Sequence, residues 1–224
     1  MRCVICGGND FIEQEVIWDQ LAAEWELSPA ERQYVDKQQG TQCCKCLCNI
    51  RSQALARAIM SHWSFTGMFQ DFLDEHPTIG ILEINEAAQL THLLSKHPGR
   101  TFAKYPEVDM HSLPYLDGSF DLVVHSDTLE HIEDPVRGLS ECRRVLRQDG
   151  LLAFTVPTIV DRMTRSRFGM PNSYHGNSTV DADDFKVFTE YGADAWRQVI
   201  AAGFEDVRIC TFEFPAGIAL AASR

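Results

Sequence analysis

Hydrophobic positions in the second half of the chain fall into short apolar runs that alternate with helical stripes. Buried strands are predicted for the runs at residues 79–84, 101–103, 108–110, 120–124 and 151–156. Apolar residues recur at helical spacing in residues 86–96 and 135–146, and Asp134-Pro135 is a typical helix start for the second. This alternation predicts an α/β fold with a doubly wound, mostly parallel sheet that is covered on both faces.

The flanking segments carry further helix and strand signals. Ser28-Pro29-Ala30-Glu31 predicts a capped helix that runs to about Lys37. Helical periodicity marks residues 51–63 and the region from Trp196 to Ile200. Residues 207–212 and 217–222 are expected to form a final strand pair. We therefore expect three units: a small lobe with an inserted helix (1–50), connecting helices (51–78) and the main domain (79–224).

Six of the eight cysteines lie in the first 48 residues, and two Cys-x-x-Cys pairs among them are separated by 36 residues. Two such knuckles can place four thiolates around Zn²⁺, and Gly7-Gly8 permits a tight turn after the first. The predicted ligands of a structural zinc ion are Cys3, Cys6, Cys43 and Cys46. Four thiolates leave no coordination position for water, so such a site is not catalytic. Cys44 or Cys48 could replace a neighbour in the second knuckle, and six unliganded cysteines are the alternative.

Composition narrows the class of protein. A chain of 224 residues that is 45% hydrophobic can bury a core, and its apolar runs are far shorter than the roughly twenty residues of a bilayer crossing. The formal net charge of -12 makes a nucleic-acid partner unlikely, because such binding comes mainly from Lys and Arg. Cys-rich sequence follows Met1 in place of an apolar leader, so we expect a cytoplasmic protein without a membrane partner. The oligomeric state is not indicated.

Residues 107–135 carry the strongest functional pattern, because two short strands are predicted there with the loops that leave their carboxyl ends. Small cofactors bind at these ends in open α/β sheets. Asp109 ends one predicted strand, and Leu113-Pro114-Tyr115 and Ser119-Phe120-Asp121 precede the next. This stretch resembles the corresponding part of class I S-adenosylmethionine-dependent methyltransferases, of the methyltransferase type 11 kind. The resemblance covers roughly residues 79–222.

The resemblance implies S-adenosylmethionine as the cofactor, bound at the tips of the first, third and fourth strands. At the position of Asp109 it implies a contact with the adenine amino group. The other residues that it places beside the cofactor are Glu83, Asn85, Ala87, Tyr105, Met110 and Ser126. It also implies that the last strand of the final pair is antiparallel to the rest of the sheet.

This chain departs from the family pattern at two places. Asn85-Glu86-Ala87-Ala88-Gln89 stands where the family carries a glycine-rich turn, and Glu86 adds a negative charge there. Asn tolerates left-handed backbone and Ala adds only one methyl group, so the turn is expected to persist. The acid that holds the ribose hydroxyls in the family is missing, and Lys104 and Tyr105 lie in its neighbourhood.

Candidate catalytic residues follow the fourth strand. His125 and His131 lie near its exit, and a histidine that titrates near neutrality suits removal of a proton from a methyl acceptor. The long connection after the fifth strand is predicted to close over an acceptor through Arg162, Arg165, Tyr174 and His175. An ordinary surface excursion is the alternative for this connection.

Together these features predict methyl transfer to oxygen or nitrogen of a small-molecule acceptor, a metabolite or sugar-like compound. One alternative is a binding or scaffold protein that has lost the cofactor turn. Another is an RNA methyltransferase, which would need more Lys and Arg beside the pocket than the group at 162–167. A nicotinamide-dependent dehydrogenase is disfavoured, because no G-x-G-x-x-G follows the first strand.

Overall fold

The computed structural model describes residues 1–174 and 183–224. Its main feature is a six-stranded sheet in the order β10-β11-β6-β5-β3-β4. The parallel strands are β3 (Ile81–Ile84), β4 (Arg100–Ala103), β5 (Phe120–Ser126) and β6 (Leu146–Thr155). The last strand, β11 (Gly217–Ser223), runs antiparallel to both of its neighbours, β6 and β10 (Arg208–Phe212). This order confirms the predicted doubly wound, mostly parallel α/β fold with an antiparallel closing pair.

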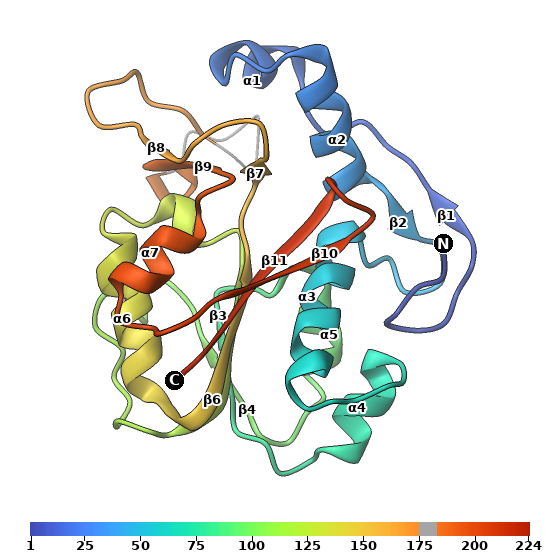
Figure 1. Ribbon diagram of the computed structural model, residues 1–224, viewed down its shortest axis with the longest axis vertical. Coiled ribbons are helices and arrows are strands. Elements are labelled where there is room, and N and C mark those ends of the chain that lie inside the picture. Colours follow the sequence, from blue (N-terminus) through green and yellow to red (C-terminus); the bar gives the residue numbers. More distant parts are fainter. Residues whose placement is uncertain (175–182) are drawn as a thin grey trace.

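Helices cover both faces of this sheet (Figure 1). One face carries α3 (Ile50–His62), α4 (Phe69–Glu75), the 3-10 turn η1 (Ala88–Leu90) and α5 (Thr91–Leu94). The other carries α6 (Pro135–Val145) and α7 (Trp196–Ala201). In β5, Leu122 and Val124 pack in the core with α3, whereas Val123 packs in the core with α6. Strands that are apolar on both faces are what a covered parallel sheet requires.

The N-terminal segment lies against the main domain on one side and above the carboxyl ends of its strands (Figure 1). It contains β1 (Phe11–Ile12), α1 (Asp19–Glu24), α2 (Pro29–Gly40) and β2 (Gln42–Cys43), and β1 pairs antiparallel with β2. The predicted start of α2 is confirmed. The backbone N–H of Glu31 donates to the Ser28 hydroxyl over 3.2 Å, and the Glu31 carboxylate accepts from the Ser28 N–H over 2.7 Å.

The connection after β6 packs against this N-terminal segment. It contains β7 (Thr158–Ile159), β8 (Arg165–Ser166), η3 (Asp183–Phe185) and β9 (Thr189–Gly192), and the three strands form a small sheet. Ile159 and Val187 share a hydrophobic core with Leu21, Trp25 and Val35. The N-terminal segment and the connection after β6 therefore pack together over the carboxyl ends of the strands of the main sheet.

Two predicted elements are wrong, and each has a local cause. Residues 108–110 form no strand, because the Asp109 side chain accepts a hydrogen bond from the His111 N–H over 2.8 Å and turns the chain there. The helix predicted over 86–96 shrinks to η1 and α5, because Asn85 and Ala88 have positive φ angles of 56° and 48° that delay its start. The sequence pattern also gave no signal for α1, α4 or the small sheet.

Candidate functional site

A cavity of about 910 Å³ lies at the carboxyl ends of β3 and β5. Its walls are the turn after β3, the loop 104–111, the exit of β5 with the short turn η2 (Leu129–His131), and part of the connection around Lys186. Gln39 at the end of α2 adds a wall from the N-terminal segment. The volume is in the usual range of about 300–1,000 Å³ for small-molecule sites.

The turn after β3 has the backbone that glycine usually supplies. Asn85 takes a left-handed conformation, as the sequence predicted, and its Oδ1 accepts from the Tyr105 N–H over 3.0 Å. The Asn85 N–H donates to the Ala103 carbonyl over 2.7 Å. Asn85 and Tyr105 both line the cavity. A glycine-free turn therefore holds the loop 104–111 against the cavity.

Glu83 holds the turn after β3 through buried hydrogen bonds and does not line the cavity. Its carboxylate is fully buried, accepts from the Ala87 N–H over 2.9 Å and from the Thr91 hydroxyl over 2.5 Å, and pairs with Arg100 Nε over 2.5 Å. Ala87 is also buried and away from the cavity wall. The structure thus contradicts the predicted cofactor contacts of Glu83 and Ala87, because the Ala87 N–H donates to the Glu83 carboxylate and neither residue lines the cavity.

Asp109 and Met110 both line the cavity from the loop 104–111. One carboxylate oxygen of Asp109 accepts from the backbone N–H and the Nδ1 of His111, each over 2.8 Å. The backbone bond is the main reason that the pKa of Asp109 lies below its usual value. Asp109 therefore caps a turn and presents an ionised carboxylate at the cavity.

The exit of β5 supplies Ser126 and Asp127 to the wall. The hydroxyls of Ser126 and Thr155 are 2.7 Å apart, and the Ser126 N–H donates to the Glu86 carbonyl over 3.2 Å, which ties the two strand-end turns together. Asp127 has a φ of 50° and forms an ion pair with Arg51 of α3. No sequence pattern points to Arg51, since an arginine in the first turn of a helix has no functional signature of its own.

Of the two histidines predicted to be catalytic, only one lines the cavity. His125 is fully buried, does not line the cavity and stacks on Phe154 with ring centroids 4.9 Å apart. Neither ring nitrogen of His125 has a hydrogen-bond partner among the described residues, and burial lowers its pKa to about 3. A catalytic role for His125 is therefore contradicted, because its ring nitrogens cannot reach an acceptor.

His131 does line the cavity. Its Nδ1 lies 3.0 Å from the Lys186 carbonyl oxygen, which only accepts, so Nδ1 carries a proton in this arrangement. Its Nε2 is 3.7 Å from a carboxylate oxygen of Glu130. The predicted role of His131 remains a prediction.

The predicted acceptor-binding arginines serve a different purpose. Arg162 donates to the Glu31 carboxylate over 2.7 and 2.9 Å and to the Trp25 carbonyl over 2.6 Å, and Arg165 pairs with Glu190 over 2.5 Å. Neither arginine lines the cavity. Arg162 fastens the connection to α1 and α2, so the prediction that these arginines bind the acceptor is wrong.

The remaining two predicted acceptor contacts gain no support. Tyr174 forms a β-bridge with Lys186 and is not on the cavity wall. His175 lies outside the described residues.

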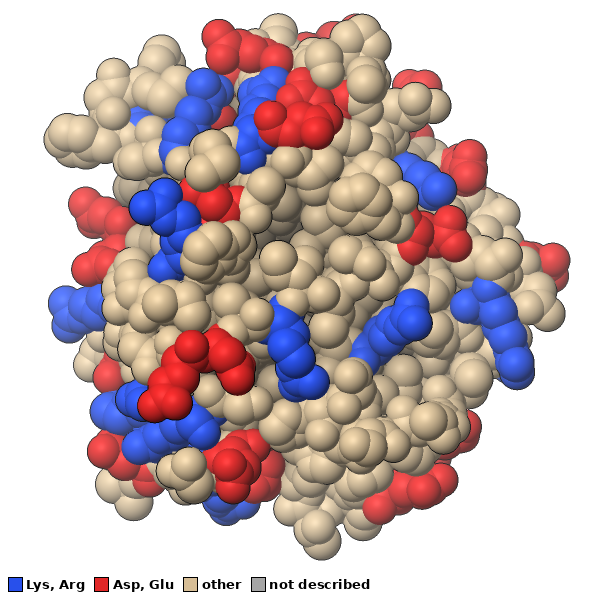
Figure 2. Space-filling view, viewed as in Figure 1, with Lys and Arg blue, Asp and Glu red and all other residues tan. Residues whose placement is uncertain are grey.

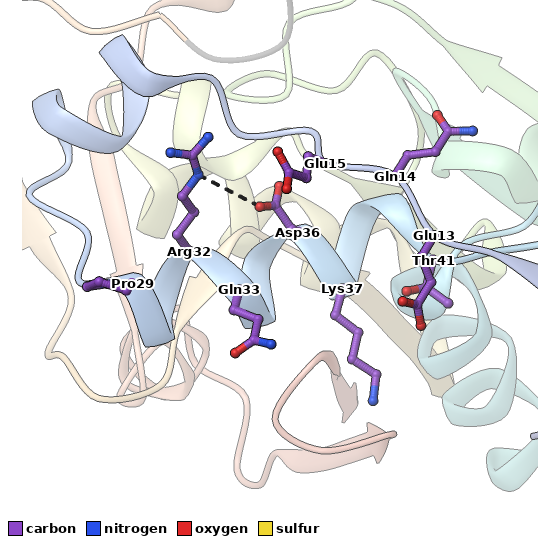
Figure 3. A pocket seen from close by; sticks show the side chains of 9 residues that line it. All are labelled: Glu13, Gln14, Glu15, Pro29, Arg32, Gln33, Asp36, Lys37 and Thr41. Atoms are coloured by element: carbon purple, nitrogen blue, oxygen red, sulfur yellow. Dashed lines mark ion pairs between the residues drawn. The ribbon is translucent and has the colours of Figure 1, made fainter.

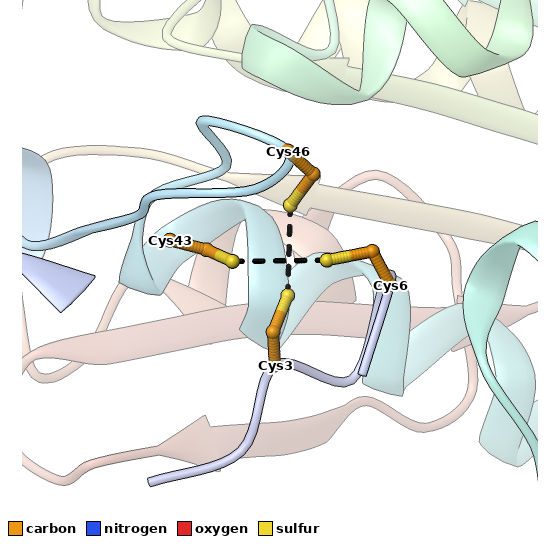
Figure 4. Close-up of side chains that lie close together, drawn as sticks. All are labelled: Cys3, Cys6, Cys43 and Cys46. Atoms are coloured by element: carbon orange, nitrogen blue, oxygen red, sulfur yellow. Dashed lines mark hydrogen bonds between the residues drawn. The ribbon is translucent and has the colours of Figure 1, made fainter. Parts of the chain in front are cut away.

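The four predicted zinc ligands converge on one point (Figure 4). Their sulfur atoms all lie within 4.8 Å of one another, with 3.6 Å between those of Cys3 and Cys46 and 3.7 Å between those of Cys6 and Cys43. Zn–S bonds of about 2.3 Å in a tetrahedron place sulfurs about 3.8 Å apart. The donor set and its spacing fit Zn²⁺, and neither Cys44 nor Cys48 belongs to the group.

The glycines after the first knuckle have a clear role. Gly7 has a φ of 74°, and a Cβ on Gly8 would lie 2.9 Å from Cys43 Sγ. A larger residue at either position would strain the turn or displace a sulfur.

A second hollow, of about 640 Å³, lies along the outer side of α2 (Figure 3). Three of the charged side chains that line it, Arg32, Asp36 and Lys37, are engaged within the protein. Arg32 pairs with Asp19 and Asp36, and Lys37 pairs with Glu213. Asp36 also accepts from the backbone N–H groups of residues 16 and 17.

The fold and the position of the cavity define an open α/β cofactor-binding protein. Residues 68–154 match the family model described as a methyltransferase domain. Over this segment the chain is similar to S-adenosylmethionine-dependent methyltransferases. Within the described residues, no helix is long and apolar enough to cross a membrane.

Individual relatives agree with this family. A probable S-adenosylmethionine-dependent methyltransferase of Mycobacterium tuberculosis is 32% identical over 123 residues, which are 54% of this chain and 39% of that protein. A malonyl-(acyl-carrier protein) O-methyltransferase of Geobacter sulfurreducens is 36% identical over 84 residues, 37% of this chain and 32% of that protein. The chain thus spans about a third of the length of these curated relatives.

Among solved structures, a possible histamine N-methyltransferase of Thermotoga maritima aligns with 78% of this chain and 89% of its own, at 14% identity and a TM-score of 0.45.

Proposed function

We propose that this protein transfers the methyl group of S-adenosylmethionine to a small-molecule acceptor, and that the 910 Å³ cavity holds both. The observation that carries the proposal is the cavity itself, built by the left-handed turn at Asn85, the Asp109 carboxylate and the exit of β5. These three features lie within the segment that matches the methyltransferase family model. Their place at the carboxyl ends of parallel strands is where open α/β proteins bind cofactors.

The residues present fit the cofactor at this place. Asp109 presents an acceptor for an amino group, and Met110, which is 4% exposed, offers an apolar surface to a flat ring. Tyr105 and Ser126 also line the cavity. Asn85, Tyr105, Asp109, Met110 and Ser126 therefore remain our candidates for cofactor contact. S-adenosylmethionine would supply an activated methyl group there.

His131 is the proposed base. Its Nδ1 donates to the Lys186 carbonyl, which leaves Nε2 as the nitrogen that can take a proton from an oxygen or nitrogen acceptor. This hydrogen bond also fixes the plane of the ring at the cavity wall. The nucleophilic oxygen or nitrogen of the acceptor would have to lie in line with the bond between the methyl carbon and the sulfur, which leaves with the nucleoside product, while His131 takes the proton of the acceptor.

A small-molecule acceptor has support from relatives and from the surface. The relatives include a malonyl-(acyl-carrier protein) O-methyltransferase and a sarcosine/dimethylglycine N-methyltransferase of Halorhodospira halochloris. On the face shown in Figure 2, Lys and Arg are dispersed among uncharged residues and Asp and Glu, and they form no continuous basic patch among the described residues. An RNA substrate would call for such a patch.

We also infer that Cys3, Cys6, Cys43 and Cys46 bind a structural Zn²⁺. The neighbouring Cys46 sulfur and burial raise the pKa of Cys3 above its usual value, and a bound cation would favour the thiolate form of this side chain. Thiols that bind metal need a reducing environment, which agrees with a cytoplasmic location.

Isothermal titration with S-adenosylmethionine and S-adenosylhomocysteine tests the proposal. We expect measurable binding of both, and at least about tenfold weaker binding after Asp109→Ala, since a hydrogen bond to a charged group contributes about 1.5–3 kcal/mol. Asp117→Ala is the matched control, because Asp117 is a 72% exposed carboxylate that pairs with Arg144. Equal affinities in the parent and Asp109→Ala would show that Asp109 is misassigned.

A scaffold function has one specific observation in its favour. Glu86, on the cavity wall, adds a negative charge where the family has glycines. If the zinc-loaded protein binds neither nucleoside at millimolar concentration, the methyltransferase proposal fails and a zinc-containing binding protein remains.

A further inference from the structure

Lys186 places a positive charge on the wall of the cavity. Its side chain is partly buried, and its Nζ lies 4.9 Å from the centre of the Phe188 ring, which lines the cavity as well. Within residues 1–174 and 183–224, no carboxylate lies at ion-pair distance from this ammonium group. An aromatic face attracts an ammonium group but leaves its charge uncompensated, so Lys186 can still bind an anion.

Backbone contacts hold Lys186 beside the proposed base. Lys186 forms an antiparallel β-bridge with Tyr174, and the Phe188 N–H donates to the Glu130 carbonyl over 2.7 Å. The Lys186 carbonyl accepts from Nδ1 of His131 over 3.0 Å. The same residue therefore orients the base with its backbone and presents a positive charge with its side chain.

The other Lys, Asp and Glu side chains on the described cavity wall are paired or exposed to solvent. Asp109 accepts from His111, and Asp127 forms an ion pair with Arg51. The remaining ones are exposed, namely Glu86, Lys104, Glu133 and Asp184. Water and salt screen exposed charges. The interior of the cavity therefore favours an anion at Lys186.

An amide group reaches the same part of the cavity from the N-terminal segment. Gln39 lines the cavity, and its Nε2 is buried without a hydrogen-bond partner among the described residues. Gln39 lies one helical turn after Val35 in α2, and Val35 shares a hydrophobic core with Val187, the neighbour of Lys186. A buried amide donor without an acceptor is unfavourable, so an oxygen atom of a ligand would stabilise it.

The backbone around Gln39 is held on two sides. Nε2 of Gln38 donates to the Ala216 carbonyl over 2.7 Å, in the hairpin between β10 and β11. Nδ2 of Asn49, which caps α3, donates to the Gln39 carbonyl over 3.4 Å. The fold therefore fixes the position from which the Gln39 amide reaches the cavity.

We propose that the methyl acceptor carries a carboxylate group, which the Lys186 ammonium and the Gln39 amide bind. One donor from each side chain serves the two oxygens of a carboxylate. A single cation matches a monoanion, whereas a phosphate group, with nearly two charges, would call for a second cation. Because Lys186 adjoins His131, the nucleophilic hydroxyl or amino group lies close to the carboxylate in the acceptor. This inference rests on the proposed function, since it names the acceptor class of the same cavity.

The test titrates matched pairs of small ligands into the protein saturated with S-adenosylhomocysteine. Each pair is a carboxylate and its primary amide, which have nearly the same shape. The three pairs are 2-hydroxybenzoate and 2-hydroxybenzamide, 2-aminobenzoate and 2-aminobenzamide, and hydroxyacetate and hydroxyacetamide. At least one carboxylate should bind at millimolar concentration, and its amide should bind at least about tenfold more weakly, because it lacks the charge that Lys186 attracts.

Variants assign this preference to the two residues. Lys186→Met should abolish the preference and leave the affinity for S-adenosylhomocysteine unchanged, whereas Lys186→Arg should retain the preference because it keeps the charge. Gln39→Met should weaken carboxylate binding by about threefold to tenfold and keep most of the preference, since it removes a neutral donor. Lys104→Met removes an exposed lysine of the same cavity wall and is the matched control; it should change the preference by less than about twofold.

Three outcomes overturn the inference. If the protein binds S-adenosylhomocysteine but prefers the carboxylate in none of the pairs, or binds no member of any pair, the carboxylate subsite is refuted while the methyltransferase proposal stands. A preference that survives Lys186→Met, or that Lys104→Met abolishes, places the anion elsewhere. Weaker binding of S-adenosylhomocysteine to Lys186→Met shows a structural role only.

A further control separates this inference from the proposed function. If the unaltered protein does not bind S-adenosylhomocysteine, the methyltransferase proposal fails. The same pairs are then titrated without the nucleoside. A carboxylate preference that depends on Lys186 supports the subsite in that case, and its absence overturns the subsite too.

Discussion

The ion pair between Glu31 and Arg162 joins α2 to the connection after β6. Its removal should lower the free energy of unfolding by an amount that depends on pH. The Glu31 side chain is 10% exposed and accepts two hydrogen bonds from Arg162, which lower its pKa from 4.5 to about 2. If the unfolded value is the usual 4.5, this shift corresponds to about 3 kcal/mol of stability at pH 7. Glu31→Gln should therefore lower the free energy of unfolding by up to about 3 kcal/mol.

The sign of the pH dependence follows from the lowered pKa. A carboxylate with a depressed folded-state pKa stabilises the protein fully above its unfolded pKa and loses that contribution as the pH falls toward the folded value. With values of 4.5 and about 2, roughly 1 kcal/mol should remain at pH 3. The stability difference between parent and Glu31→Gln should thus shrink as the solution becomes more acidic.

Urea unfolding of parent and variant between pH 7 and pH 3 measures this difference. Gln also caps a helix at the third position, so the substitution keeps the capping bonds with Ser28 and isolates the charge. Glu13→Gln, an exposed carboxylate of the same lobe, is the control and should change stability by less than about 0.5 kcal/mol at every pH. A difference that stays constant with pH, or one no larger than that of the control, would refute the assigned role of the ion pair.

Three further substitutions test other parts of the structure. Cys6→Ser should abolish stoichiometric zinc and lower the melting temperature by roughly 5 °C or more, whereas the exposed Cys44→Ser should do neither; metal analysis and calorimetry decide, and retained zinc would contradict the site. Glu83→Gln should destabilise by about 3 kcal/mol, because it leaves Arg100 unpaired beneath the turn; an unchanged urea midpoint would show that the turn does not need this carboxylate. His125→Phe should keep turnover and change stability by less than about 1 kcal/mol, since the ring makes no hydrogen bond among the described residues; a folded but inactive variant would restore its catalytic role.

Local signals in the sequence predicted those parts of the fold that local physics determines. The caps at Ser28 and Asp134 start α2 and α6 as expected, because each side chain accepts from a backbone N–H three residues later. Asn85 adopts the left-handed turn, and the paired knuckles bring four sulfurs together. In each case the information lies within a few residues or in a fixed spacing.

The wrong or missing predictions concern residues whose partners are distant in the sequence. Arg162 has no partner near it in the sequence, which favours a role toward an acceptor, yet Glu31, 131 residues away in the chain, binds it. Arg51 carries no sequence signal for the same reason, since its partner Asp127 is 76 residues away.

His125 was the one error that the sequence pattern could have prevented. It shares the strand parity of Val123, and both side chains face the α6 side of β5, where Phe154 lies. Two-residue alternation therefore placed His125 in the core, even though its neighbours Ser126 and Asp127 reach the cavity.

A crystal structure of the protein with S-adenosylhomocysteine tests the central claim most directly. We expect density for the adenosyl group beside Asp109 and Met110, within the cavity at the strand ends. Density for the nucleoside at the groove along α2, or a strand-end cavity that stays free of ligand at saturating concentration, would contradict it.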